Sequence, residues 1–97
     1  MSNDTIQVRH NREHHRYEVE LDGQRAVIQY RDTGGARYYL HTEVPEALEG
    51  HGIASKMAKF ALDEAQAEGL TIVPLCPFVR GYIERHPEYQ ALVKQAG

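Results

Sequence analysis

Hydrophobic residues change their spacing at Pro45, and this change limits the folds that the chain can adopt. Upstream of Pro45 they alternate with polar residues, as in strands that bury one face. From Ile53 onward they recur every three or four residues, as on one face of an amphipathic helix. Proline lacks a backbone donor and favours extended geometry in the residue before it, here Val44, so a strand should stop or bulge at Pro45. The chain is therefore predicted to form strands first and helices later.

Three alternating stretches upstream of Pro45 predict β-strands, at residues 16–21, 24–31 and 37–44. Asp22-Gly23 and the run from Thr33 to Gly35 are typical of tight reversals, so these strands should pair antiparallel. Residues 7–10 offer a fourth strand at the edge. In the third strand, alternation separates two faces. One face is predicted to hold Tyr39, His41 and Glu43, and the other Tyr38, Leu40, Thr42 and Val44.

After Pro45, a loop at 46–50 should lead into a helix. Its expected apolar face is formed by Ile53, Met57, Phe60, Ala61 and Ala65. Gly69 should end this helix as a left-handed cap. Residues 70–75 are nearly all apolar and predict a strand covered on both faces, which a helical crossover would make parallel to the third strand. Two short helices are expected at 78–85 and 87–94.

These elements predict the α/β (α+β) class. The expected fold is one domain, residues 1–97, with a mixed and mostly antiparallel sheet, a central crossover helix and C-terminal helices. The chain has 11 Lys and Arg against 14 Asp and Glu, a net charge of −3, which does not favour nucleic-acid binding. It shows neither a membrane span nor a secretory signal, and its single cysteine, Cys76, excludes an internal disulfide. We expect a cytoplasmic protein that binds neither nucleic acid nor membranes.

The run Gly50-His51-Gly52-Ile53-Ala54-Ser55 lies between a predicted strand and the start of the long helix. Glycines allow successive backbone amides to converge, and a helix N-terminus adds unpaired N–H groups and partial positive charge. This arrangement favours an anion, and phosphate is the natural candidate. Two glycines before a helix can also form a simple turn.

Glu49-Gly50-His51-Gly52-Ile53-Ala54 resembles the acetyl-CoA-binding motif of the GNAT acyltransferase superfamily, in which Arg or Gln is followed two residues later by Gly-x-Gly/Ala. Gly52 and Ala54 fit this motif, whereas Glu49 stands where Arg or Gln is usual. The segments 41–45, 74–79 and 86–89 resemble the small stand-alone N-acetyltransferase-like branch of that superfamily. The resemblance implies a minimal GNAT fold, in which the strand before the loop splays from the following parallel strand and leaves a wedge for the pantetheine arm of acetyl-CoA.

The resemblance also implies which residues bind the coenzyme. The pyrophosphate would cap the helix at Gly50, His51, Gly52, Ala54 and Ser55. The backbone around Glu43 and Val44 would bind the pantetheine and the acetyl carbonyl. Lys56 could reach coenzyme phosphates, and His86 lies in a segment that the resemblance places beside the wedge. No metal is expected.

Acetyl transfer to an amine needs a base, an oxyanion donor and a proton source for the leaving thiolate. His41 and Glu43 are the candidate bases, and the amide of Val44 is the candidate oxyanion donor. Cys76, between the last strand and a helix, could protonate the thiolate, accept the acetyl group as a nucleophile, or simply pack as a small buried residue. Tyr82 resembles the tyrosine that protonates the thiolate in some GNAT enzymes, or it packs in the core.

Two other functions compete with an acetyl-CoA-dependent N-acetyltransferase. One is an acyl-CoA-binding or sensing module without turnover, which Glu49 in the motif and the shortness of the chain favour. The other is an interaction domain with a vestigial loop. His10, His14 and His15 could suggest a metal site, but adjacent strand residues point to opposite faces, so a solvated loop or tight turn is the preferred interpretation. The sequence identifies neither the amine acceptor nor the oligomeric state.

Overall fold

The structure of the chain is a computed structural model that describes residues 6–94. Five strands form one sheet in the order β1-β2-β3-β4-β5. Their bounds are Arg9–Asn11 (β1), Arg16–Leu21 (β2), Gln24–Thr33 (β3), Ala36–Glu43 (β4) and Thr71–Pro74 (β5). The helical elements are η2 at Glu46–Leu48, α1 at Ile53–Ala67, α2 at Pro77–Arg85 and η3 at Pro87–Leu92.

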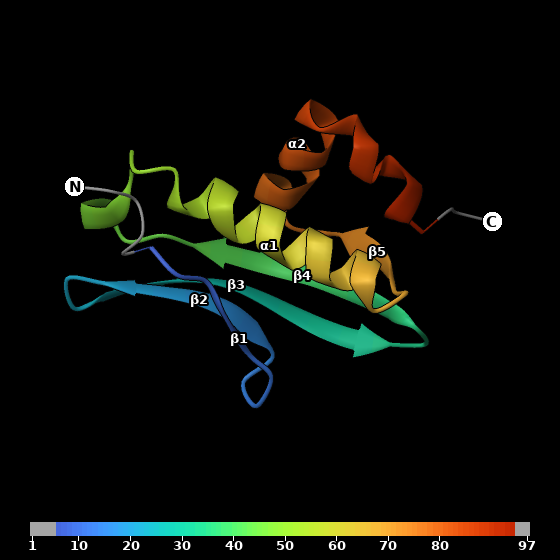
Figure 1. The fold of residues 1–97 in the computed structure, drawn as a ribbon, viewed down its shortest axis with the longest axis horizontal. Helices are drawn as coiled ribbons and strands as arrows, with labels where there is room; N and C mark the ends of the chain where they lie inside the picture. The colour runs from blue at the N-terminus through green and yellow to red at the C-terminus, as the bar shows by residue number, and fades with distance from the viewer. Residues whose placement is uncertain (1–5, 95–97) are drawn as a thin grey trace.

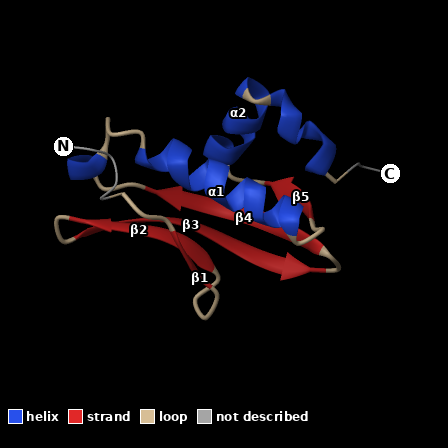
Figure 2. Cartoon of the chain, viewed as in Figure 1, coloured by secondary structure: helices blue, strands red, loops and turns tan. Residues whose placement is uncertain are grey.

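The sheet is mixed, as the sequence predicted. Strands β1 to β4 pair antiparallel, and β5 pairs parallel to β4 through the α1 crossover. Both α1 and α2 lie on one side of the sheet (Figures 1 and 2), and the described part of the chain places no helix on the other side. We call these two sides the helix-covered face and the open face. No helix among residues 6–94 has the length and hydrophobicity needed to cross a bilayer.

Local sequence signals explain where several elements begin and end. Asp22 and Gly23 both have positive φ, 53° and 74°, which is the geometry of the tight hairpin between β2 and β3. Gly69 has φ +73° and follows α1, where the amide of Leu70 donates to the carbonyl of Ala65 at 3.0 Å. This is the left-handed cap that the sequence predicted.

The helix-covered face holds the hydrophobic core. Tyr17, Val19 and Ile28 of the sheet are fully buried beneath Met57 and the other apolar residues of α1. Helix α2 adds Val79 and Ile83, which are also buried. The hydrophobic spacing thus selects one face of the sheet and one face of each helix, and burying them together provides the main driving force for folding.

A β-bulge at Leu40 changes the predicted faces of β4. Gln29 pairs with His41 and Tyr30 pairs with Tyr39, so Leu40 is an extra residue in the ladder. Strict alternation would put Tyr39 on the same face as His41, and this expectation was wrong. Tyr39 is instead fully buried on the helix-covered face, where its hydroxyl donates to the carbonyl of Ala61 at 3.0 Å.

Four further details differ from the sequence-based expectations. Strand β5 is an edge strand that is buried on one side at Ile72 but only half-buried at Val73 and exposed at Thr71, so it is not covered on both faces. The last predicted helix is a 3₁₀ helix and ends at Leu92. Phe60 is 38% exposed rather than part of the core. The candidate fourth strand lies at Arg9–Asn11, shifted from 7–10.

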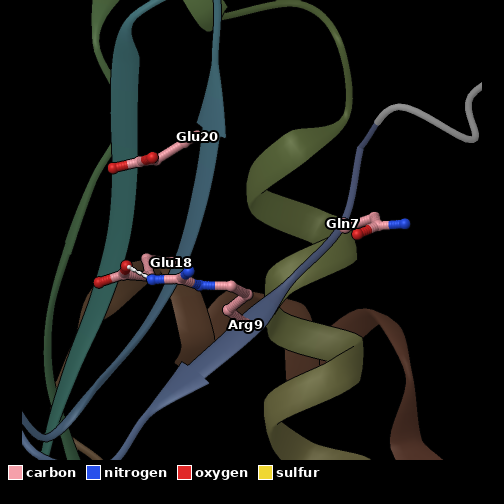
Figure 3. A pocket seen from close by; sticks show the side chains of 4 residues that line it. All are labelled: Gln7, Arg9, Glu18 and Glu20. Carbon is pink, nitrogen blue, oxygen red and sulfur yellow. Dashed lines mark hydrogen bonds and ion pairs between the residues drawn. The ribbon is translucent and has the colours of Figure 1, made fainter.

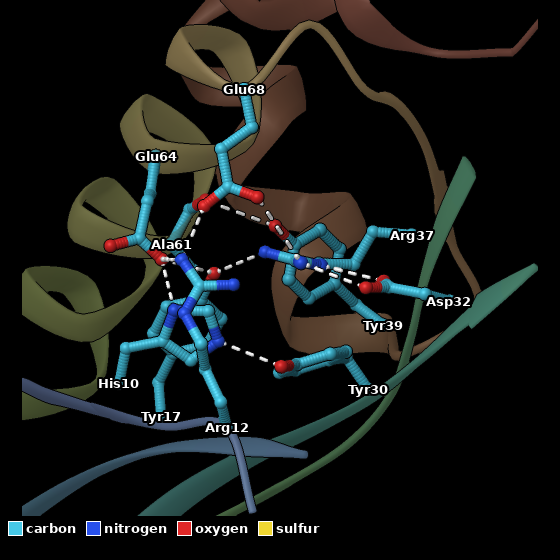
Figure 4. Close-up of polar contacts among 10 residues, drawn as sticks. All are labelled: His10, Arg12, Tyr17, Tyr30, Asp32, Arg37, Tyr39, Ala61, Glu64 and Glu68. Atoms are coloured by element: carbon cyan, nitrogen blue, oxygen red, sulfur yellow. Dashed lines mark hydrogen bonds and ion pairs between the residues drawn. The ribbon is translucent and has the colours of Figure 1, made fainter. Parts of the chain in front are cut away.

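A buried polar cluster joins the sheet to α1 (Figure 4). Arg37, 1% exposed, donates hydrogen bonds to both carboxylate oxygens of Asp32, at 2.7 and 2.8 Å, and to the hydroxyl of Tyr17 at 2.7 Å. Its guanidinium carbon lies 4.3 Å from the ring centre of Tyr30. Burial opposes the charge, but these partners outweigh it and raise the pKa of Arg37 above its ordinary value. The buried guanidinium therefore stays charged and paired.

His10 belongs to this same cluster, which corrects the expectation that it lies in a solvated turn. Its ring stacks on Tyr17 with centres 4.3 Å apart, its Nε2 lies 2.7 Å from the hydroxyl of Tyr30, and its Nδ1 contacts Glu64 (Figure 4). Burial lowers the pKa of His10, although Glu64 opposes this shift. His14 and His15 do lie in the turn between β1 and β2.

Glu18 lies on the open face of the sheet, as the alternation of polar and apolar residues in β2 predicts, but its side chain is buried. It is 2% exposed and accepts hydrogen bonds from Arg9 at 2.8 Å, Arg16 at 2.7 Å and Asn11 at 3.2 Å. Burial favours the neutral acid, but these donors outweigh it and lower the pKa of Glu18 to about 2. Figure 3 shows Arg9 beside Glu18 at the rim of a small hollow.

Candidate functional site

Strands β4 and β5 separate beyond Tyr39. Their ladder runs from Ala36 opposite Thr71 to Tyr39 opposite Pro74, and β4 then continues to Glu43 without β5 beside it. The amides of Leu75 and Cys76 both donate to the carbonyl of Tyr39, at 3.0 and 2.9 Å, as the chain turns away toward α2. The splayed strands that the GNAT resemblance implies are therefore present.

A groove of about 580 Å³ occupies this wedge, and we call it the wedge groove. Five of the predicted site residues line it: His41, Glu43, Val44, Ala54 and Cys76. The remaining lining residues are Leu40, Thr42, Glu49, Pro77 and Phe78. The structure thus gathers candidate bases, a candidate acid and the candidate oxyanion donor around one opening, from segments more than 30 residues apart in the sequence.

The glycine loop lines a second groove of about 280 Å³, which we call the loop groove. Gly50, Gly52 and Ser55 contribute to its wall. Val44, Glu49 and Ala54 line both this groove and the wedge groove, so the two form one continuous path from the start of α1 to Cys76. A long ligand with an anionic end and an extended arm has the shape to follow this path.

The backbone amides of the loop are free to bind an anion. Gly52, with φ +71°, is the N-cap residue of α1, and no side chain caps the helix. The first amide that bonds back to the loop is that of Lys56, which donates to the carbonyl of Gly52 at 3.0 Å. Within residues 6–94, no protein atom accepts a hydrogen bond from the backbone amides of residues 50–55. A Cβ added at Gly52 would meet no atom within 4 Å, so the space above these amides is open.

Cys76 lies at the N-cap of α2 and is 3% exposed. Its Sγ lies 3.0 Å from the hydroxyl oxygen of Thr42, and the two groups form a hydrogen bond across the wedge. No sequence motif marks Thr42 as a site residue. Its contact depends on the bulge at Leu40, which brings Thr42 opposite Ile28 on the helix-covered face.

His41 and Glu43 share the open face of β4, as alternation beyond the bulge requires. His41 Nε2 lies 3.8 Å from a carboxylate oxygen of Glu43, and the two side chains are 57% and 74% exposed. They therefore reach the wedge groove from its solvent side, whereas Thr42 and Cys76 reach it from the protein side. A molecule in the groove would lie between the two pairs.

Tyr82 and His86 lie away from both grooves. Their rings stack with centres 4.1 Å apart, and Tyr82 also packs against Tyr89, whose hydroxyl donates to Asp63 of α1 at 2.6 Å. Tyr82 is 5% exposed, and burial raises the pKa of its hydroxyl. The structure thus places both residues in the contact between α2, η3 and α1.

Lys56 and His51 are exposed, and neither lines the loop groove. Lys56 instead borders a hollow formed with Ile6, Val8 and Phe60. His51 projects from the loop between the two glycines. Any contact of these side chains with a ligand would come from outside the groove walls.

His10, Glu64 and Glu68 bring three potential metal-ligand atoms within 4.8 Å of one another. The guanidinium of Arg12 lies 2.6 Å from Glu68 and 3.9 Å from Glu64, and that of Arg37 lies 3.6 Å from Glu68 (Figure 4). These two fixed positive charges already balance the carboxylates and would repel a cation. The arrangement is that of an internal ion-pair network.

Comparison with known proteins places these features in a family context. Residues 16–92 match the GCN5-related N-acetyl-transferase family. The chain is 40% identical over 90 residues to the protein named NATD1 of Gallus gallus, covering 90% of this chain and 82% of that protein, and 39% identical to NATD1 of Homo sapiens, covering 90% and 80%. The solution structure of a GCN5-like protein from Staphylococcus aureus superposes with a TM-score of 0.73 at 23% identity, covering 100% of this chain and 94% of that one.

Proposed function

Because this chain belongs to the GCN5-related N-acetyltransferase family, we propose that it binds acetyl-CoA and transfers the acetyl group to an amine. One observation carries this proposal: the amides of residues 50–55 have no acceptor within residues 6–94 and lie at the N-terminus of α1, beside a groove that leads to Cys76. Such a helix start attracts a diphosphate because its unpaired N–H groups and the helix dipole both favour negative charge.

In this proposal the loop groove holds the diphosphate and the wedge groove holds the pantetheine arm. Gly50, Gly52, Ala54 and Ser55 line or adjoin the diphosphate position, and His51 would add its backbone amide. Val44 lies where the two grooves meet, so its backbone would bind the pantetheine and the acetyl carbonyl. Lys56 remains a candidate for an outer phosphate contact, whereas His86, which stacks on Tyr82 away from both grooves, does not.

The transfer forms a C–N bond between the amine and the acetyl carbon and breaks the C–S bond of the thioester. The amine must lose a proton, which His41 or Glu43 would accept through water on the solvent side of the groove. The amide of Val44 would stabilise the developing oxyanion. The departing thiolate needs a proton, which the thiol of Cys76 would supply while the hydroxyl of Thr42 holds it in place.

Cys76 is favoured over Tyr82 as the proton donor because Cys76 lines the wedge groove and Tyr82 does not. A second role for Cys76 would give the same product in two steps: the thiolate accepts the acetyl group from the thioester and then passes it to the amine. Trapping of an acetylated protein by mass spectrometry separates these two roles, since only the second requires a covalent species on Cys76.

The alternative is an acyl-CoA-binding module without turnover. Glu49 supports it, because this carboxylate lines both grooves at the position where the coenzyme phosphates are proposed to bind. A negative charge there weakens coenzyme binding, which suits a sensor that must release its ligand.

Acetyl-CoA binding and amine-dependent release of free coenzyme A test both functions. A transferase should be stabilised against thermal unfolding by acetyl-CoA and should release thiol faster when amines are added. A saturating ligand at 100 times its Kd should stabilise the fold by about 2.7 kcal/mol. Stabilisation without amine-dependent release across a broad panel would support the binding module. Absence of any stabilisation would refute both.

A further inference from the structure

A third groove, of about 520 Å³, is lined by His14, His15, Gln29, Tyr30, Arg31, Asp32 and Leu40. We call it the open-face groove because Gln29 and Arg31 lie on the open face of the sheet. It is bordered by the second half of β3, with Gln29 and Arg31, and by the turn that carries His14. The register places Gln29 opposite His41 and Arg31 opposite Tyr38, so these β3 side chains share the face of the candidate base His41.

Leu40 joins this groove to the wedge groove. The bulge leaves the Leu40 side chain 42% exposed, and Leu40 lines both grooves. The Leu40 side chain therefore offers an apolar contact at the border between the two grooves. A molecule in the open-face groove would therefore reach the solvent side of the wedge at His41.

The open-face groove presents an unpaired positive charge. Asp32 is the only carboxylate among its described lining residues, and both oxygens of Asp32 already accept hydrogen bonds from Arg37. Arg31 is exposed and forms no ion pair within residues 6–94. Arg25, on the same strand, is also exposed but is paired with Glu20 at 2.6 Å. Arg31 is thus the charge that this groove offers to a ligand.

We propose that the open-face groove binds the acetyl acceptor and that the acceptor is a small amine carrying a carboxylate or phosphate group. This inference rests on the proposed function. The anionic group pairs with Arg31, and the amine crosses Leu40 toward His41. Along β3, Arg31 is two residues from Gln29, the partner of His41, a separation of roughly 7 Å. The side chains of Arg31 and His41 can converge across this separation. A ligand whose amine and anionic group are only a few bonds apart therefore fits between them.

The binding test uses two matched pairs of amines, with NMR detection of backbone amides in the full chain with and without bound coenzyme A. L-alanine is compared with L-alaninamide, and O-phosphoethanolamine with ethanolamine. In at least one pair, the amine that carries a carboxylate or phosphate group should shift the amides of Gln29, Arg31 and Leu40 in a saturable manner, while its counterpart without that group should not. The pair that responds identifies carboxylate or phosphate. Equal responses within both pairs, or shifts elsewhere, overturn the proposal.

Charge variants provide the control. Arg31→Gln should weaken binding of the anionic amine by about fivefold, the effect expected for one exposed ion pair, and Arg31→Lys should restore most of it. Arg25→Gln removes a similar charge from the same strand and should leave binding unchanged. If Arg25→Gln weakens binding as much as Arg31→Gln, a general field effect accounts for the result and the groove assignment is wrong.

Thiol release from acetyl-CoA separates this proposal from the function on which it rests. Turnover with no preference between members of a pair would leave the transferase standing and overturn the open-face groove. Saturable, Arg31-dependent binding of the anionic amine without any turnover would support the groove and contradict the transferase.

Discussion

Replacing Gly52 by asparagine or aspartate should separate the backbone role of this residue from its place beside a phosphate. Gly52 has φ +71°, so any side chain there adopts a left-handed conformation, and asparagine and aspartate tolerate it better than other residues. No atom lies within 4 Å of an added Cβ, so neither variant should clash. Both should lose about 1 kcal/mol of folding stability from backbone strain.

The two variants differ by one negative charge. Two unit charges 4 Å apart interact by about 1 kcal/mol in water and about 4 kcal/mol near a protein surface. For the open loop groove we expect about 2 kcal/mol, so Gly52→Asp should bind coenzyme A about 30-fold more weakly than Gly52→Asn.

Isothermal titration calorimetry at low ionic strength measures this ratio. Gly35 supplies the matched control, because it also has positive φ with open space around it but lies in the turn between β3 and β4. Asparagine and aspartate at Gly35 should bind coenzyme A equally. Equal affinities for Gly52→Asn and Gly52→Asp, with intact folding, would refute a phosphate site at the loop.

Three further changes test neighbouring parts of the structure. Glu49→Gln should tighten coenzyme A binding about threefold to tenfold in calorimetry, because it removes a repulsive charge; unchanged affinity would place the phosphates elsewhere. Glu18 has its pKa lowered to about 2 from a usual 4.5, so its stabilising effect is complete above about pH 4.5 and disappears as the pH falls toward 2. Glu18→Gln should therefore reduce stability at pH 7 by about 3 kcal/mol and flatten acid unfolding between those values; a parallel acid transition would contradict this. Tyr89→Phe should cost about 1 kcal/mol in denaturant unfolding by removing the bond to Asp63; no loss would mean that solvent replaces it.

The sequence predicted the order and pairing of the strands well because hydrophobic spacing and turn residues are local signals. The alternation around Tyr17 and the Asp22-Gly23 turn suffice to place the hairpin of β2 and β3, and the spacing from Ile53 to Ala65 suffices for the long helix. The exposure of β5 was not predicted because its short apolar run, 70–75, does not show whether a neighbour covers it.

The candidate site was predicted in part. The glycine loop and Cys76 carry their own sequence signals, and the structure brings them onto one continuous path. Thr42 and Leu40 could not be identified as site residues from the sequence, because their positions depend on a β-bulge that no residue type predicts. Tyr82 carried a family signal, yet the packing of α2 against α1 decides which way it points.

A crystal structure of the chain with bound coenzyme A would locate the diphosphate. We expect diphosphate oxygens about 2.7–3.2 Å from the amide nitrogens of Gly52, Ala54 and Ser55, with the pantetheine arm between β4 and β5. Density for the diphosphate anywhere else, with the amides of residues 50–55 bonded only to water, would contradict it.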